Sequence, residues 1–255
     1  MNTDSFKGQV AIVTGAGQGI GFEICRQLAL QGASVLLNDI DEKLTSSAVN
    51  KITDEGGICI GLAGDASDID FINKMVSLVI SNFGKLTIAI ANAGITLFAD
   101  FFDYTSDSFN KVMQLNLSGS FFLAQAAAKQ MKQQKTGGSI LFMSSVVGHQ
   151  AHKNLSAYAI TKAGLEMLAK NLVIDLSPYN ININTIAPGA TLTERTLNDA
   201  DFEKTWSRIT PIGRPASTND IANAALFLVN PISRHITGQS LIVDGGWTSV
   251  SPSPY

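Results

Sequence analysis

The stretch QVAIVTGAGQGIG, residues 9–21, decides the fold of this chain. Its first part, Gln9 to Thr14, is a short apolar run typical of a buried strand, and a helical pattern follows from Gly19 to Gln31. The glycines between them allow a tight turn and leave room for a ligand next to the backbone. The stretch therefore predicts a strand, a turn and a helix whose positively polarised N-terminus could bind a phosphate group.

The spacing of these glycines departs from the common pattern G-x-G-x-x-G. Apart from Gly17, they lie at positions 15, 19 and 21, and Thr14 precedes them. A glycine-rich turn that binds nothing remains the alternative, but a strand before the turn and a helix after it favour a dinucleotide site. The residues of the turn that we expect to contact a dinucleotide are Gly15, Gln18, Gly19, Ile20 and Gly21.

Beyond this stretch, short apolar runs continue to alternate with helical patterns, which is typical of βαβ units. Further strands are expected at residues 34–38, 58–63, 86–94, 139–144, 181–189 and 240–246, and helices at 42–54, 69–83, 107–135 and 157–176. Nearly continuous apolar strands predict an α/β fold, a doubly wound parallel sheet between two layers of helices. We expect a single domain over residues 1–255, because no linker or repeat divides them, and a loose tail at SPSPY, residues 251–255.

A carboxylate at the end of the second predicted strand bears on the choice of dinucleotide. Asp39 lies eighteen residues after Gly21, where it could accept hydrogen bonds from both hydroxyls of an adenosine ribose. A 2'-phosphate would instead meet like charge from Asp39, Asp41 and Glu42. The sequence therefore favours NAD(H) over NADP(H). Capping of the next helix is the alternative for the two aspartates, and we expect it for Asp41 only.

The composition points away from several classes of partner. The formal net charge is -3, with 18 Lys and Arg against 21 Asp and Glu, so nothing favours nucleic acid. No basic helix, apolar leader or long apolar run indicates a membrane, and a cytoplasmic protein with small-molecule partners is expected. Cys25 and Cys59 lie in helical and strand-like patterns without a Cys/His cluster, so we expect them in the core and expect no metal site.

A second group of residues suggests chemistry. Tyr158 and Lys162 lie four residues apart in a predicted helix, so both side chains project from one face. A positive charge beside the phenol stabilises the phenolate, and Tyr158 could then exchange protons near neutral pH. Ser145 follows the apolar run SILFMS, and its hydroxyl could hold a substrate oxygen. By chance alone, roughly one such chain in five would contain a Tyr-x-x-x-Lys pair, so the pair needs support.

That support comes from several motifs in order along the chain. They are TGAGQGIG at 14–21, Asp65 in GDAS, ANAG at 91–94, Asn116, Ser145, YAITK at 158–162, Pro188 with Gly189, and VDGG at 243–246. Together they resemble the short-chain dehydrogenase/reductase family in its compact single-domain form, over nearly the whole chain. The resemblance implies a Rossmann-like fold, a nicotinamide cofactor and interconversion of a secondary alcohol and a ketone. Ala91 stands where the family usually has Asn.

The resemblance also implies roles for individual residues. Asn116, Ser145, Tyr158 and Lys162 form the catalytic set; Asn116 positions a water beside the lysine, and Lys162 also binds the nicotinamide ribose. The adenine ring is held by Asp65 and Ala66, and the adenosine ribose packs on Asn92, Ala93 and Gly94. Contacts at the nicotinamide end are implied for Tyr158, Lys162, Pro188, Gly189, Thr191 and Thr193.

A long segment at residues 190–215, between a strand and the next helix, is expected to form a substrate loop or lid. Within it, Phe202, Trp206 and Ile209 have helical spacing, which fits either a lid helix docked on the core or direct ligand contacts. The residues that we expect around the substrate are His152, Gln150, Val147, Leu192 and Trp206, with a solvated loop histidine as the alternative for His152. This mostly apolar set favours partly apolar ketones over sugars, whose unpaired hydroxyls would cost about 1 to 3 kcal/mol each.

The leading hypothesis is an NAD(H)-dependent oxidoreductase that interconverts a secondary alcohol and a ketone with Tyr158 as general acid and base. A 3-oxoacyl-[acyl-carrier-protein] reductase or a sugar or polyol dehydrogenase is the alternative within the class. Asp39 argues against the former, because those relatives mostly resemble NADP users. A nucleotide-binding protein without chemistry is the alternative from another class, and the intact catalytic set argues against it. A homotetramer is expected from the resemblance and from the apolar faces at 121–131 and 163–173.

Overall fold

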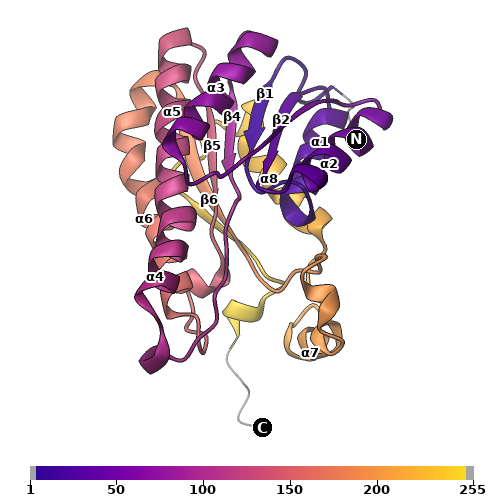
Figure 1. Cartoon of the computed structure of the whole chain (residues 1–255), viewed down its shortest axis with the longest axis vertical. Helices are drawn as coiled ribbons and strands as arrows, with labels where there is room; N and C mark the ends of the chain where they lie inside the picture. Colours follow the sequence, from indigo (N-terminus) through magenta and orange to yellow (C-terminus); the bar gives the residue numbers. More distant parts are fainter. Residues whose placement is uncertain (1–3, 251–255) are drawn as a thin grey trace.

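A computed structural model describes residues 4–250 of the protein, so the tail at 251–255 lies outside the described residues. Within these described residues, seven parallel strands form one sheet with the order β3-β2-β1-β4-β5-β6-β7 (Figure 1). The strands are β1 (Val10–Val13), β2 (Ser34–Asp39), β3 (Ile58–Ala63), β4 (Ile88–Ala91), β5 (Gly138–Met143), β6 (Ile181–Pro188) and β7 (Ser240–Val243). The predicted α/β fold with a parallel, doubly wound sheet is confirmed.

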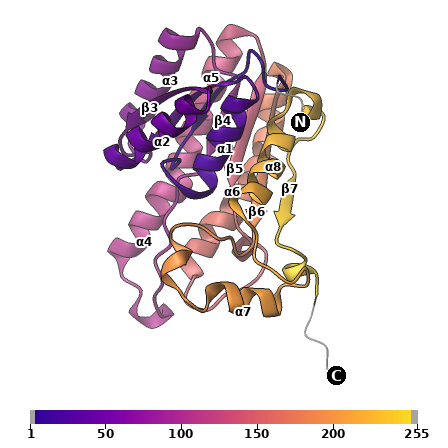
Figure 2. The same ribbon diagram turned by 90° about the vertical axis from the view of Figure 1, so that its right-hand side faces the viewer.

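Helices cover both faces of this sheet, as the two views in Figures 1 and 2 show. The longer ones are α1 (Gly19–Leu30), α2 (Glu42–Asp54), α3 (Ile69–Phe83), α4 (Ser106–Val112), α5 (Ser120–Gln134), α6 (Ser156–Leu176), α7 (Phe202–Ile209) and α8 (Thr218–Val229). One buried cluster joins the sheet to α1, α2 and α8, and the other joins it to α3, α5 and α6. The expected three layers of helices, sheet and helices are therefore present.

The strands form these two clusters because successive side chains of a strand point to opposite faces. In β1, Ala11 and Val13 belong to the cluster with α1, and Val10 and Ile12 to the cluster with α3. All four side chains are buried, which is why the strand appears as a continuous apolar run in the sequence. Cys25 and Cys59 are also buried, as expected, and burial raises the pKa of the Cys59 thiol to about 12.

The order of the strands reverses beside β1. From β1 the chain proceeds through β2 to β3, and it then crosses back so that β4 pairs with the other edge of β1. Loops that follow neighbouring parallel strands on the two sides of such a point diverge and leave a crevice. The glycine turn after β1 and the ANAG segment that ends β4 lie at this crevice.

The helix expected at residues 107–135 is not regular. It consists of α4, a π-helical stretch at Met113–Gly119, and α5. At its end, a Cβ on Gly119 would lie 2.7 Å from the carbonyl oxygen of Ala66, so the helix backbone passes directly against the loop after β3. The apolar pattern could not reveal the wider turn, because hydrophobic spacing alone does not show where one residue is added to a turn.

Local signals in the sequence agree with the structure elsewhere. Asp41 caps α2, as expected, because its carboxylate accepts hydrogen bonds from the backbone N–H groups of Lys43 and Leu44.

Of the helices in residues 4–250, none is both long and apolar enough to cross a membrane.

Candidate active site and cofactor cleft

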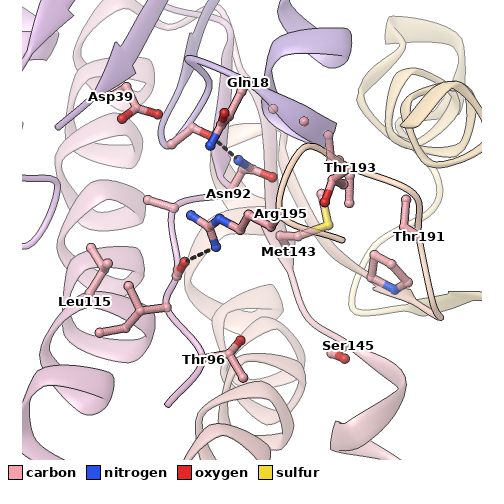
Figure 3. Close-up of a pocket in the computed structure, with 18 of the residues that line it drawn as sticks. Gln18, Asp39, Asn92, Thr96, Leu115, Met143, Ser145, Thr191, Thr193 and Arg195 are labelled. Carbon is pink, nitrogen blue, oxygen red and sulfur yellow. Dashed lines mark hydrogen bonds between the residues drawn. The ribbon is translucent and has the colours of Figure 1, made fainter. Parts of the chain in front are cut away.

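A cavity of about 420 Å³ opens at the carboxyl ends of the central strands (Figure 3). Every residue predicted to bind the cofactor lines it, and so does Ser145. From the turn after β1 and the ends of β2 and β3 come Gly15, Gln18, Gly19, Ile20, Gly21, Asp39, Asp65 and Ala66. From the segments after β4 and β6 and from α6 come Asn92, Ala93, Gly94, Pro188, Gly189, Thr191, Thr193, Tyr158 and Lys162.

The glycine turn fits closely against its surroundings. Gly15 and Gly19 have φ angles of 61° and 65°, which other residues adopt with strain. A Cβ on Gly15 would lie 2.6 Å from Cα of Ala93, and a Cβ on Gly21 would collide with the side-chain amide of Asn92. The turn can therefore carry no side chain at these positions without moving the segment after β4.

The side chain of Asn92 joins the two loops of the crevice. Its amide nitrogen donates hydrogen bonds to the carbonyl oxygens of Thr14 at 2.9 Å and of Gly15 at 2.8 Å. In return, the hydroxyl of Thr14 accepts from the backbone N–H groups of Asn92 and Ala93, each at 3.2 Å. Figure 3 shows one of the Asn92 bonds from the glycine turn to the floor of the cavity.

Asp39 ends β2 with its carboxylate toward the glycine turn. One oxygen accepts a hydrogen bond from the backbone N–H of Gly17 at 3.0 Å, and the other accepts from that of Asp41 at 3.1 Å. The side chain remains on the wall of the cavity. It therefore holds the turn in place and presents negative charge to the same end of the cleft.

The predicted catalytic pair lies on the face of α6 toward the cavity. Lys162 is only 3% exposed, and its Nζ donates a hydrogen bond to the carbonyl oxygen of Met143 at 2.6 Å. The same nitrogen lies 5.2 Å from the centre of the Tyr158 ring. Ser145 follows β5, where its hydroxyl caps the short helical turn Val146–Gly148. The structure thus brings Ser145, Tyr158 and Lys162 to one cavity wall.

Asn116 lies behind that wall, in the π-helical stretch, and is fully buried. Its carboxamide accepts a hydrogen bond from the backbone N–H of Ile95 and donates one to the carbonyl of the same residue, both at 2.9 Å. A Cβ on Gly94 would lie 3.3 Å from the Asn116 oxygen and 3.6 Å from Nζ of Lys162. Asn116 therefore fixes the segment after β4 and lies close to the lysine without lining the cavity.

The five residues predicted to surround the substrate are not among those that line this cavity, so their role stays a prediction. The residues concerned are His152, Gln150, Val147, Leu192 and Trp206. His152 and Gln150 are exposed on the loop before α6, whereas Val147 is buried in the turn after Ser145. Trp206 packs edge to face on Trp247, with ring centres 5.3 Å apart. Helical spacing and loop position did not show which way these side chains point.

The segment after β6 supplies other residues instead. It is pinned at its base by backbone bonds from Leu192 and Ala216, and α7 follows within it. Arg195 extends from it across the cavity, where its guanidinium lies 3.4 Å from the carbonyl oxygen of Gly94 (Figure 3). Phe202, the first residue of α7, also lines the cavity, whereas Trp206 packs on Trp247. The two interpretations of the helical spacing, a docked lid helix and direct ligand contacts, stay open.

Comparisons with known proteins agree with this geometry. A family model described as enoyl-(acyl carrier protein) reductase matches residues 15–248. An L-rhamnose 1-dehydrogenase (NAD(P)(+)) of Azotobacter vinelandii is 37% identical over 246 residues, which cover 93% of this chain and 96% of that protein. The chain belongs to the short-chain dehydrogenase/reductase family.

Other members of the short-chain dehydrogenase/reductase family are similar at comparable levels. A 7alpha-hydroxysteroid dehydrogenase of Escherichia coli K12 is 36% identical, covering 96% of this chain and 97% of its own. The crystal structure of a short-chain dehydrogenase/reductase from Mycobacterium marinum superposes with a TM-score of 0.91 at 29% identity, over 97% of this chain and 98% of that one. The predicted family is therefore confirmed, and with it an oxidoreductase acting on alcohols and ketones.

The sequence did not identify every residue of the cavity wall. The residues missed are Asn38, Ile40, Gly64, Leu115, Met143, Ser144, Glu194, Arg195 and Thr196. Most of them are immediate neighbours of residues that were predicted, so extending each motif by one or two positions would have found them. Leu115 is one residue before Asn116, and only the wider turn of the π-helix shows that it faces the cavity.

A substitution at Asn116 tests whether this residue fixes the segment after β4. Asn116→Leu would remove the side-chain partners of the part-buried N–H and carbonyl of Ile95, so we expect the free energy of unfolding to fall by about 1 to 3 kcal/mol. Amide hydrogen exchange at Ile95 should accelerate. Asn116→Asp, which keeps the acceptor for the Ile95 N–H, should slow that exchange again. Unchanged exchange at Ile95 in the leucine variant would contradict the assignment.

Proposed function

We propose that the protein is an NAD(H)-dependent oxidoreductase that interconverts a secondary alcohol and a ketone, with Tyr158 as general acid and base. One observation carries the proposal: Ser145, Tyr158 and Lys162 face the same cavity as the glycine turn and Asp39. A dinucleotide that lies along this cavity would reach from Asp39 at one end to the tyrosine and lysine at the other. We retain a single domain, with residues 190–215 as its substrate loop.

The residues of the cleft fit a nicotinamide dinucleotide. The turn presents the N-terminus of α1, and its missing side chains leave the backbone open to a diphosphate. Asp65 and Ala66 would hold the adenine ring, and Pro188, Gly189 and Thr191 the nicotinamide amide. When bound, the nicotinamide would supply or accept a hydride, and the protein residues would manage the accompanying proton.

The proton chemistry follows from the positions of three side chains. Tyr158 would give its hydroxyl proton to the ketone oxygen, or accept a proton from the alcohol in the reverse direction. The buried ammonium of Lys162 beside the ring stabilises the phenolate that remains. Ser145 would hold the substrate oxygen toward Tyr158. The bond from Lys162 to the Met143 carbonyl keeps the charge in place.

Asn116 would connect Lys162 to a proton relay by positioning a water molecule. Its support is proximity, because the Asn116 oxygen and Lys162 Nζ both lie within 4 Å of the position that a Cβ on Gly94 would take. The side-chain amide itself is already bonded to Ile95 and to the hydroxyl of Thr161 at 3.3 Å. A water beside Lys162 would therefore donate to the second lone pair of the Asn116 oxygen or to backbone carbonyls of this helix.

The residues of the cavity wall are compatible with more than one class of substrate. The relatives include enzymes named for L-rhamnose and for a 7alpha-hydroxysteroid, a polar and a largely apolar substrate. Thr96 and Arg195, both in the cavity wall, offer hydrogen-bond donors that a sugar could use. We therefore keep two candidates, partly apolar ketones and a sugar or polyol, and a panel of both with NADH or NAD would separate them by kcat/KM.

A homotetramer remains part of the proposal. On α5 and α6, Phe121, Met167 and Ile174 are 37%, 57% and 79% exposed, and contact of these helices with a second copy of the chain would cover them. Sedimentation of the purified protein at micromolar concentration should give the mass of four chains, with two as the smaller alternative. A single chain at that concentration would refute the proposal.

Tyr158→Phe tests the proton chemistry. The change removes the hydroxyl and keeps the ring, so turnover should fall by about 100-fold or more while the Kd for NADH stays within about twofold. The measurements are steady-state kinetics on the best ketone of the panel and NADH fluorescence titration. Lys162→Ala should lose turnover and NADH affinity together. A Tyr158→Phe enzyme with a tenth of the wild-type kcat would contradict the assignment.

Asp39→Asn tests the choice of cofactor. The wild type should prefer NADH to NADPH in kcat/KM, and removal of the charge should narrow this preference by about tenfold, or ~1.4 kcal/mol. The asparagine can still accept from the N–H of Gly17, whereas Asp39→Ala would also release the turn and weaken both cofactors. Asp54→Asn, at the exposed far end of α2, is the control. Equal wild-type values for the two cofactors would show that Asp39 does not discriminate.

A further inference from the structure

A chain of polar side chains extends from Ser144, in the cavity wall, to residues outside the predicted site. The carboxylate oxygen Oε1 of Glu166 lies 2.7 Å from the hydroxyl of Ser144 and 2.8 Å from Nε2 of His149. The Ser144 hydroxyl also lies 3.0 Å from the carbonyl oxygen of Lys162. Three segments thus meet at one carboxylate: the end of β5, the turn that follows it, and α6.

Glu166 is costly to keep in this place. It is 9% exposed, Ser144 is 2% exposed, and the side chain of His149 is 28% exposed. A buried carboxylate requires hydrogen-bond donors, and an apolar residue of similar size would often stabilise a protein as well. Stability alone therefore gives no reason for a glutamate here. Its hydrogen bonds instead maintain the position of the turn after β5 against α6.

The close contact between the turn and α6 shows what that geometry is. A Cβ on Gly148 would lie 3.1 Å from the backbone nitrogen of Ala163 and 3.2 Å from Oε1 of Glu166. The turn at Val146–Gly148 therefore packs directly on the α6 backbone one residue after Lys162. Ser145 begins this turn, so any movement of the turn relative to α6 changes the position of Ser145 relative to Tyr158.

We propose that Glu166 is a positioning residue that, through Ser144 and His149, fixes the turn of Ser145 against the helix of Tyr158 and Lys162. The inference rests on the proposed function for its catalytic meaning. Glu166 touches neither the cavity nor the reacting atoms and acts by holding the serine and tyrosine hydroxyls at one separation. A displacement of about 1 Å in such a pair costs up to about 100-fold in rate.

The hydrogen bonds also show which property of Glu166 is required. The hydroxyl of Ser144 has one proton and two acceptors within reach, and Nε2–H of His149 donates to the same carboxylate oxygen. One acceptor oxygen between two donors is sufficient for this arrangement. A glutamine oxygen provides that acceptor without the charge, whereas a leucine side chain fills the space and provides no acceptor.

The experiment compares Glu166→Leu, Glu166→Gln and His149→Ala with Asp175→Asn, which removes an exposed carboxylate from the same helix. We measure kcat and KM for the ketone that the wild type reduces fastest, and the Kd of NADH by fluorescence. Glu166→Leu should lower kcat by about tenfold or more and leave the Kd of NADH within about twofold. Glu166→Gln should have a kcat within about threefold of the wild type. The control variant Asp175→Asn should have the same kcat as the wild type.

The kcat of the double variant His149→Ala with Glu166→Leu gives a further test. His149 and Glu166 would act through the same wild-type hydrogen bond, which ends at Oε1 of Glu166. The double variant should be no slower than Glu166→Leu alone, whereas independent effects would multiply. Wild-type kcat in Glu166→Leu, or no recovery in Glu166→Gln, would overturn the proposal.

Hydrogen exchange separates this inference from the proposed function. Exchange in residues 144–149 should accelerate in Glu166→Leu and recover in Glu166→Gln, without change in the glycine turn at 14–21. If the wild type reduces no ketone, the proposed function fails, and accelerated exchange still supports the positioning role. Unchanged exchange at 144–149 in the leucine variant overturns that role whatever the activity.

Discussion

The hydrogen bonds from the Asn92 carboxamide to the carbonyls of Thr14 and Gly15 are the constraint on which the cleft depends. They join the loops after β1 and β4 where the strand order reverses and the loops would otherwise separate. The same bonds explain two of the glycines. A side chain on Gly21 would displace the Asn92 amide, and one on Gly15 would displace Ala93. The glycine motif and the ANAG motif are thus two halves of one packed contact, and each is needed whether or not a ligand is bound.

A second constraint acts on the segment after β4 from the side opposite Asn92. The π-helical stretch at Met113–Gly119 turns Asn116 inward to both backbone groups of Ile95 and brings Gly119 against the carbonyl of Ala66. The segment after β4 is therefore held from both sides, by Asn92 toward β1 and by Asn116 toward α6. Because wider turns of this kind often occur at functional sites, the irregular helix is better understood as part of the cleft than as a defect in a long helix.

The sequence predicted the fold, and the residues that it assigned to a cofactor line one cavity, because both depend on backbone position. Strands such as β1 are apolar throughout, and the positions of Gly15, Asp39 and Pro188 follow directly from the ends of the strands before them. The predicted substrate residues do not line this cavity, because a residue's place on the wall depends on side-chain direction in loops, which the sequence does not show. Trp206 has the right spacing and the right segment but packs on Trp247, whereas Arg195, one residue among many in that loop, crosses the cavity. The π-helical stretch at Met113–Gly119 was missed, because the spacing of apolar residues over a long helix does not show where one turn contains an extra residue.

Three consecutive residues at the end of β5 show why the same chemistry can serve different substrates. The carbonyl of Met143 receives Lys162, the hydroxyl of Ser144 contacts α6, and Ser145 faces the cavity. Strand β6 extends this support, since the N–H of Ser144 donates to the carbonyl of Ile186 one residue beyond the paired strand. The sheet thus fixes the positions of the residues proposed for catalysis. The segment from Thr191 to Ala216 is closed at its base by backbone bonds, and its inner contacts, such as Trp206 on Trp247 and the Ile212 N–H to the Gly245 carbonyl, do not involve Tyr158 or Lys162. Loops attached in this way can change without disturbing the tyrosine and lysine, which is consistent with relatives named for a sugar and for a steroid.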